Sequence, residues 1–127
     1  DEVQLPARLL AATARALAQG QALLVAPGCE RVRAPGRESW ADLSRRDAPR
    51  RILGTLVEHR LRGLGPVSLR ELFACGWPDE QIPWDSARNR VHVALSALRR
   101  LGLRELLVSV EDGYVLEQGA PVLRVPK

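Results

Sequence analysis

The residues best suited to bind a charged partner lie between Ser86 and Arg104, a segment with five arginines and no acidic side chain. A guanidinium keeps its positive charge, and its planar fork of N–H donors matches the oxygens of a phosphate or a carboxylate. The nearby sequence SVEDGYVLE predicts a hairpin with two acids, Glu111 and Asp112, at its tip. The chain therefore places a cationic segment beside an acidic turn.

No comparable cluster supports catalysis or metal binding. The two cysteines, Cys29 and Cys75, and the two histidines, His59 and His92, are scattered along the chain and match no metal-ligand spacing. The sequence has no phosphate-cradling glycine loop and no nucleophile beside a candidate base. We therefore expect no enzyme activity, no metal and no cofactor, and we expect both cysteines to be free thiols in the cytoplasm.

The composition of the 127 residues limits the class of protein. A hydrophobic fraction of 46% and a charged fraction of 27% are typical of one globular domain. The net charge of +4 favours a nucleic-acid partner, but Lys127 is the sole lysine, so the arginine excess can also reflect a GC-rich coding sequence. No apolar run approaches the ~20 residues of a membrane span, so we expect no membrane partner. Because methionine is absent, we expect Asp1 to follow an upstream part of a longer protein.

Turn signals divide the chain into an N-terminal segment and one domain. Residues 1–20 predict an alanine-rich helix or linker, with Leu10, Ala14 and Leu17 on one stripe. This helix is expected to pack on the domain or to continue an upstream helix, and dimerisation is the alternative. In residues 21–127, three extended segments that end at Pro-Gly pairs or a serine predict a small antiparallel sheet. They read QALLVAP, ERVRAP and ESWADLS.

Three helices are predicted after the sheet. The buried stripe of the first consists of Ile52, Leu53, Leu56, Val57 and Leu61. Ser44 or Asp47 can cap this helix, and Pro49 favours the later start because proline fits a first turn. The second helix begins with Ser68 and Glu71 in capping-box spacing, where each side chain can bond the other's backbone N–H, and it ends at Gly76. Its predicted inward face is Leu69, Leu72 and Phe73.

The third helix is predicted over about residues 86–101, with Asp85 as its N-cap and Gly102 as its end. Val91, Leu95 and Leu98 form its buried stripe, and Ala94 allows a close approach. The other faces carry Arg88, Asn89, Arg90, His92, Val93, Ser96, Ala97, Arg99 and Arg100. Two strands, ELLVSV and YVLE, then form the hairpin, for which Asp112-Gly113 is the turn signal, and PVLRV can add another strand.

This order of elements resembles the winged helix-turn-helix effector domains of OmpR/PhoB-type response regulators and the related domain of SARP-type activators. The residues that carry the resemblance are VSLRELFACGWPDE, RVHVALSALRRLGL and DGYVL, within residues 22–118. It implies an α+β fold with an N-terminal antiparallel sheet, a three-helix core and a C-terminal β-hairpin wing, to which this chain adds an N-terminal helix. It also implies a DNA-binding domain of transcriptional regulation, with the third helix in the major groove.

The resemblance assigns roles to individual side chains of the third helix. The residues expected to read bases are Arg88, Asn89, His92, Val93 and Ser96, and those expected near phosphates are Arg90, Arg99, Arg100 and Arg104. Arginine can bond guanine bidentately and asparagine can bond adenine in the same way, so the side chains suit the task. The loop before the helix is a candidate contact for RNA polymerase or another partner, through Asp79, Glu80, Gln81 and Trp84.

This sequence departs from the family pattern at three places. Ala97 stands where an arginine is usual, Val115 stands where a basic residue commonly follows the wing tyrosine, and the acidic tip has the wrong sign for phosphates. The turn requirement explains Asp112, whereas a tip that avoids DNA or meets a basic surface is the alternative. The arginines can also form a solvated face, and the whole module can serve protein–protein docking without DNA binding. Specific recognition by a single domain would need a homodimer or an upstream signalling domain.

Overall fold

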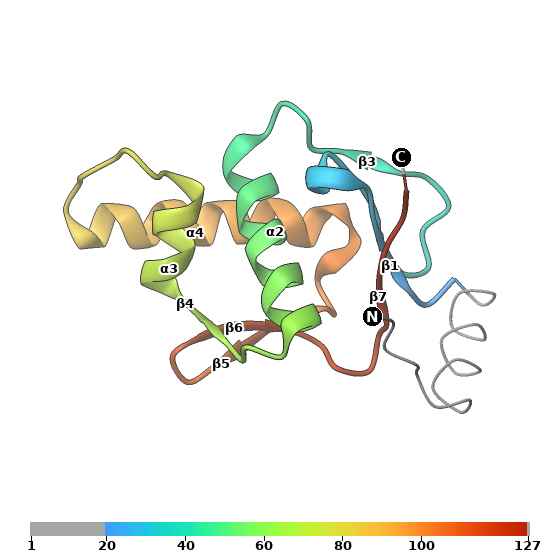
Figure 1. Cartoon of the computed structure of the whole chain (residues 1–127). Helices are drawn as coiled ribbons and strands as arrows, with labels where there is room; N and C mark the ends of the chain where they lie inside the picture. Colours follow the sequence, from blue (N-terminus) through green and yellow to red (C-terminus); the bar gives the residue numbers. More distant parts are fainter. Residues whose placement is uncertain (1–19, 127) are drawn as a thin grey trace, which may run out of the picture.

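The computed structural model describes residues 20–126, in which short connections join the helices and strands (Figure 1). The predicted N-terminal helix lies outside these residues. The strands are β1 (Leu23–Val25), β2 (Arg31–Arg33), β3 (Ala41–Asp42), β4 (Val67–Ser68), β5 (Leu107–Val110), β6 (Gly113–Leu116) and β7 (Val122–Arg124). The α-helices are α2 (Asp47–Arg62), α3 (Leu69–Gly76) and α4 (Trp84–Leu98). A 3-10 turn covers Pro27–Cys29, and a π-helical turn covers Arg99–Leu103.

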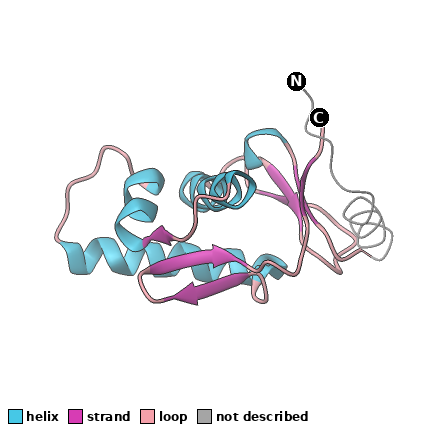
Figure 2. Cartoon of the chain, turned by 60° about the horizontal axis from the view of Figure 1, so that its bottom comes forward, coloured by secondary structure: helices cyan, strands magenta, loops and turns pink. Residues whose placement is uncertain are grey.

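The first sheet contains the three strands predicted at the start of the domain. β1, β2 and β3 pair antiparallel in sequence order. β7 then lies beside β1, parallel to it, so the predicted strand PVLRV joins this sheet and not the hairpin. The order is β3-β2-β1-β7, and the sheet stands at one end of the molecule (Figure 2). The α+β class expected from the sequence is confirmed.

The second sheet contains the predicted hairpin and one further strand. β5 and β6 pair antiparallel around the two-residue turn Glu111–Asp112, and β4 pairs with the other edge of β6. The turn differs from the expectation, because Gly113 already belongs to β6 and neither turn residue has a positive φ. Gly113 is needed for another reason: a Cβ at this position would lie 2.0 Å from the Val67 carbonyl oxygen on β4.

Helix α2 begins at Asp47, as the proline at position 49 favours, and runs through the middle of the molecule (Figure 1). Asp47 is the first helical residue and makes no side-chain cap bond, so the expected capping role is wrong. The predicted stripe is buried apart from Leu61, which is 44% exposed. In the last turn, the Arg60 guanidinium donates to four backbone carbonyls, one at the end of β6 and three in the chain after it.

The capping box of α3 forms in one direction only. The Glu71 backbone N–H donates to Ser68 Oγ at 3.1 Å, as predicted. The return bond differs, because Ser68 Oγ donates to Glu71 Oε1 at 3.2 Å. The expected bond from the Ser68 backbone N–H to the Glu71 side chain is not formed, and Ser68 instead also ends β4, where it lies opposite Gly113. Leu72 is fully buried and Phe73 is half-buried, and the Phe73 ring stacks on Trp77 with centroids 5.5 Å apart.

Helix α4 starts earlier than predicted, at Trp84, with Pro83 as its N-cap. Asp85 therefore lies in the first turn, where a negative charge favours the helix dipole, and does not cap it. The helix ends through the π-helical turn, in which Gly102 adopts φ 108°, a value that favours glycine. A Cβ there would lie 2.7 Å from the Ala34 Cβ, so Gly102 also lets the turn pack against the segment after β2.

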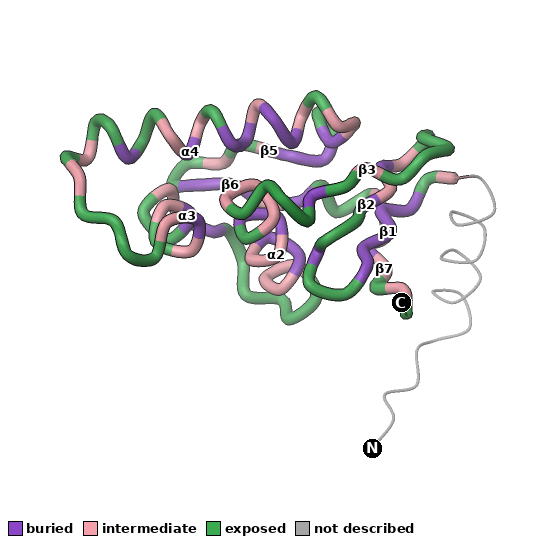
Figure 3. Tube along the Cα trace, turned by 90° about the horizontal axis from the view of Figure 1, so that it is seen from above, coloured by how far each residue is buried: buried purple, intermediate pink, exposed green. Residues whose placement is uncertain are grey.

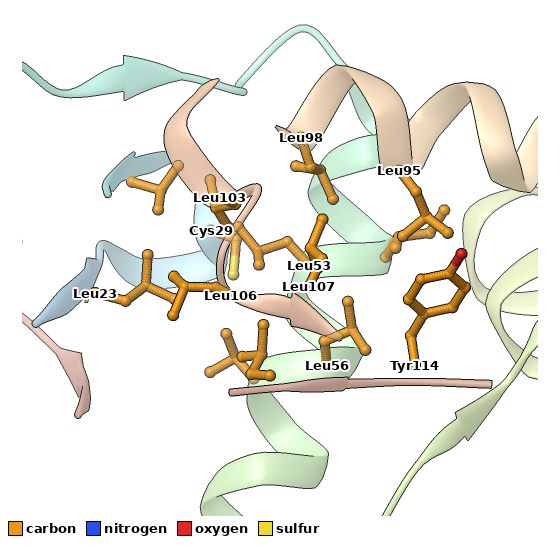
Figure 4. Packing of buried hydrophobic residues seen from close by; sticks show 14 of the residues in the cluster. Leu23, Cys29, Leu53, Leu56, Leu95, Leu98, Leu103, Leu106, Leu107 and Tyr114 are labelled. Carbon is orange, nitrogen blue, oxygen red and sulfur yellow. The ribbon is translucent and has the colours of Figure 1, made fainter. Parts of the chain in front are cut away.

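The hydrophobic core lies where α2, α4 and both sheets meet (Figure 4). Leu53 and Leu56 of α2 meet Leu95 and Leu98 of α4, and all four are almost completely buried. The predicted stripe of α4 and the close approach at Ala94 are thus confirmed. Full burial of one such leucine contributes roughly 1.5–3 kcal/mol, so this contact fixes the position of α4.

Candidate nucleic-acid interface

The outer face of α4 is exposed from its first turn to Val93, and the residues from Ala94 to Leu98 are buried or half-buried (Figure 3). α4 contains 15 residues, which corresponds to a rise of about 22 Å. Its inner face packs on α2 and α3, while its amino-terminal end and the preceding loop project from the molecule (Figure 1). The buried stripe therefore leaves the predicted contact residues on the remaining surface.

The predicted base-reading residues differ in how far their side chains are exposed to solvent. Arg88, Asn89 and Val93 are exposed, and Val93 reaches 62%, a high value for an apolar side chain. His92 and Ser96 are half-buried. The structure thus exposes a guanidinium, an amide and an apolar group on α4, with Asn89 and Val93 on the side toward Trp77 and Arg88 on the side toward the hairpin. These are the side-chain types that can bond guanine, bond adenine and contact the thymine methyl group.

The predicted phosphate-binding arginines differ in their surroundings. Arg100 and Arg104 are exposed, whereas Arg99 is half-buried, with its guanidinium carbon 5.6 Å from the Tyr114 ring centroid. Arg90 differs from the others because it pairs with Glu80 at 2.7 Å. Within residues 20–126, no carboxylate lies in ion-pair distance of Arg88, Arg99, Arg100 or Arg104. Four of the five cations of the segment therefore remain available to an anionic partner.

Ala97 is buried, which corrects its assignment to the outer face. The start of α2 lies opposite it: the N-cap residue Arg46 and, in the first turn, Ala48 and Pro49 line one side of a groove whose other side is α4. This groove has a volume of about 270 Å³, and Trp77, Val93 and Ala97 make it largely apolar.

The connection between α3 and α4 carries the predicted partner-binding residues. Asp79, Glu80 and Gln81 are exposed, and Glu80 is held by its pair with Arg90. Trp84 is no loop residue, because it begins α4 and is half-buried. The Arg70 guanidinium carbon lies 4.2 Å from its ring centroid. Sequence reasoning missed Arg70, because fourteen positions separate it from Trp84 and no local pattern joins them.

A groove separates α4 from the hairpin tip. It has a volume of about 480 Å³, and we call it the polar groove. Its lining residues are Ser68, Leu69, Arg70, Arg88, His92, Ser109, Val110, Glu111, Asp112, Gly113 and Tyr114. Two arginines line the walls formed by α3 and α4, and two acids line the hairpin wall. The acidic tip predicted from the sequence thus shares one groove with the cationic helix.

Both cysteines are free thiols, as expected. Burial raises the pKa of Cys29 and also that of Cys75, which disfavours the reactive thiolates. Among residues 20–126, no group of three or more His, Cys, Asp or Glu side chains is placed to hold a metal ion. Over the same residues, no helix has both the length and the apolar character that a bilayer crossing requires.

Searches of protein-family models, of curated proteins and of solved structures each found no match to this chain. The arrangement of α2, α3, α4 and the β5–β6 hairpin is compatible with a winged-helix fold.

Proposed function

We propose that this domain is a winged helix-turn-helix module that binds double-stranded DNA through α4 and serves transcriptional control in the cytoplasm. The observation that carries the proposal is the outer face of α4. Its amino-terminal half is exposed, the segment from Ser86 to Arg104 contains no acidic residue, and four arginines of that segment have no carboxylate partner in the described part of the chain. A solvated face without function would gain stability from interspersed acids, and this face has none.

The length of α4 allows different parts of the helix to contact bases and backbone phosphates. Its rise of about 22 Å exceeds the ~12 Å width of the major groove, so one half can enter the groove while the other half meets the flanking backbone. Arg88 and Asn89 lie in the projecting half, Val93 lies just beyond the middle of the helix, and these three side chains are assigned to base edges. Arg100 and Arg104 lie beyond the other end and are assigned to phosphates. Arg90 is assigned to the support of the α3–α4 loop through Glu80.

The test is equilibrium binding of the whole chain to a labelled random duplex, followed by fluorescence anisotropy at low salt. We expect a Kd of about 10⁻⁴ to 10⁻⁶ M and a slope of log K against log salt of roughly −3, because on a random duplex Arg88 and Arg99 can neutralise phosphates in addition to Arg100 and Arg104. Arg88→Glu/Arg100→Glu should weaken binding by more than about tenfold. Arg31→Glu/Arg62→Glu, on β2 and α2, makes the same change in net charge and should have a much smaller effect.

A second candidate function is protein–protein docking, which the apolar groove beside α4 favours. Val93 is exposed there next to Trp77 and Pro49, and an apolar partner residue could fill the groove. If the wild-type chain and both double variants bind duplex equally, or none of them binds, the docking function replaces DNA binding. A Val93→Ser variant would then reduce partner binding without changing retention on heparin.

A further inference from the structure

Arg70 is an exposed cation that is held in place by an aromatic ring. It lies in the first turn of α3, and its guanidinium carbon is 4.2 Å from the Trp84 ring centroid, at the first residue of α4. A guanidinium over a tryptophan face is attracted by the ring quadrupole and stacks through its own plane. Among residues 20–126, Arg70 forms no ion pair within 4.0 Å. Its N–H donors are therefore oriented but not consumed by a carboxylate.

Arg70 and Arg88 lie on neighbouring walls of the polar groove. Arg88 belongs to the half of α4 that is assigned to the major groove, so the DNA strand that borders this groove would pass Arg70. The opposite wall carries Glu111 and Asp112, which repel a phosphate and leave the α3–α4 side as its favoured position. The Ser68 hydroxyl, which also lines the groove, is engaged with the Glu71 carboxylate and backbone N–H.

We propose that the polar groove is a subsite for one backbone phosphate of the bound DNA, with Arg70 as its principal ligand and Trp84 as the residue that positions Arg70. This inference rests on the proposed function and adds a contact from α3 to those made by α4. The stacked guanidinium loses less rotamer freedom on binding than a free arginine, since Trp84 already restricts it. Trp84 thus strengthens the contact without touching the phosphate.

The test compares four variants of the whole chain in the same duplex titration at several salt concentrations. Arg70→Ala should weaken binding about tenfold at low salt and make the salt slope shallower by about 0.9, the value for one phosphate. Trp84→Leu should weaken binding about threefold and leave the slope unchanged, because the charge remains. Arg70→Lys should keep the slope but not the full affinity, because an ammonium lacks the planar fork. Arg62→Ala, an exposed arginine of α2, is the control.

The results separate the two proposals. A wild-type chain that binds duplex while Arg70→Ala leaves both affinity and slope unchanged overturns the phosphate subsite and leaves DNA binding by α4 intact. A Trp84→Leu variant that changes the slope overturns the positioning role. Absence of any duplex binding by the wild-type chain overturns the function itself and the subsite with it. Urea unfolding midpoints of all variants show whether a lost affinity comes from lost folding.

Discussion

Gly113 shows how one residue fixes the contact between two strands. In the β4–β6 pair, the Val67 carbonyl lies where a Cβ at position 113 would have to be placed. We expect Gly113→Ala to reduce the free energy of unfolding by about 3 kcal/mol, because the added methyl group forces the strands apart. Urea unfolding measures this loss. Gly119→Ala, where the nearest atom would lie 3.9 Å away, should change stability by less than about 0.5 kcal/mol.

Glu58 links α2 to the last strand and makes stability depend on pH. A hydrogen bond from Arg124 at 2.5 Å, with smaller effects of Arg62 and His59, lowers the pKa of Glu58 below its ordinary value. The folded state therefore binds this proton less readily than the unfolded state. The stabilisation is present above the unfolded pKa of 4.5 and disappears as the pH falls through the lower folded value.

Glu58→Gln should accordingly flatten the decline of stability as the pH falls from above the unfolded pKa of 4.5 to below it. Urea midpoints measured across that range for both chains test the effect. Glu38→Gln removes an exposed carboxylate outside these ion pairs and serves as control. Equal slopes in wild type and Glu58→Gln would show that the pair contributes nothing to the acid response.

At the scale of elements, the guanidinium of Arg60 joins α2 to the connection between the two sheets. It donates to the carbonyl oxygens of Leu116, Glu117, Gln118 and Ala120 at 3.3, 2.7, 3.3 and 2.6 Å. Lysine keeps the charge but not the planar fork of donors, so Arg60→Lys should lose about 1–3 kcal/mol of stability. Thermal or urea unfolding checks this loss. Arg62→Lys, two residues later and paired with Glu58, should lose much less stability. Similar losses in the two variants would contradict a stabilising role of the four Arg60 hydrogen bonds.

The hairpin bears its acids on the wall that faces α4. If DNA occupies α4 as proposed, Glu111 and Asp112 lie near its phosphates and oppose binding. Neutralising both residues with Glu111→Gln/Asp112→Asn should tighten duplex binding about threefold to tenfold at low salt, and the gain should shrink as salt rises. Anisotropy titrations measure it, with Glu30→Gln/Glu38→Gln as the charge-matched control. An unchanged affinity would place the tip away from the DNA.

At the scale of the whole molecule, the sequence predicted what local patterns determine. The stripe Val91, Leu95 and Leu98 follows from helical periodicity, and it is buried. Errors arose where distant segments compete for one surface. Ala97 is buried next to the start of α2, and Leu61 is exposed while the adjacent Arg60 donates to carbonyls at and after the end of β6. Neither choice is visible in a local window.

The sequence predicted which helix face forms the candidate interface, but it did not predict which side chains contact one another there. The acid-free run of arginines indicated the face, whereas the pair of Arg90 with Glu80 and the stack of Arg70 on Trp84 depend on how α3 and α4 meet. Gly113 was predicted as part of the hairpin turn, whereas the structure requires a glycine there because Val67 of β4 lies against it. Periodicity did not indicate the strand β4.

The parallel pairing of β1 with β7 has a mechanical consequence. Leu23, Leu24 and Val25 lie opposite Val122, Leu123 and Arg124, and hydrogen bonds at both ends of the pair extend it. Tension applied between residues 22 and 125 pulls the two strands along their length in opposite directions. Their hydrogen bonds are then loaded in shear and must break together, whereas an antiparallel hairpin pulled at its open end unzips one bond at a time. When the domain is pulled at these two positions, the β1–β7 pair is therefore loaded in the direction in which it resists force best.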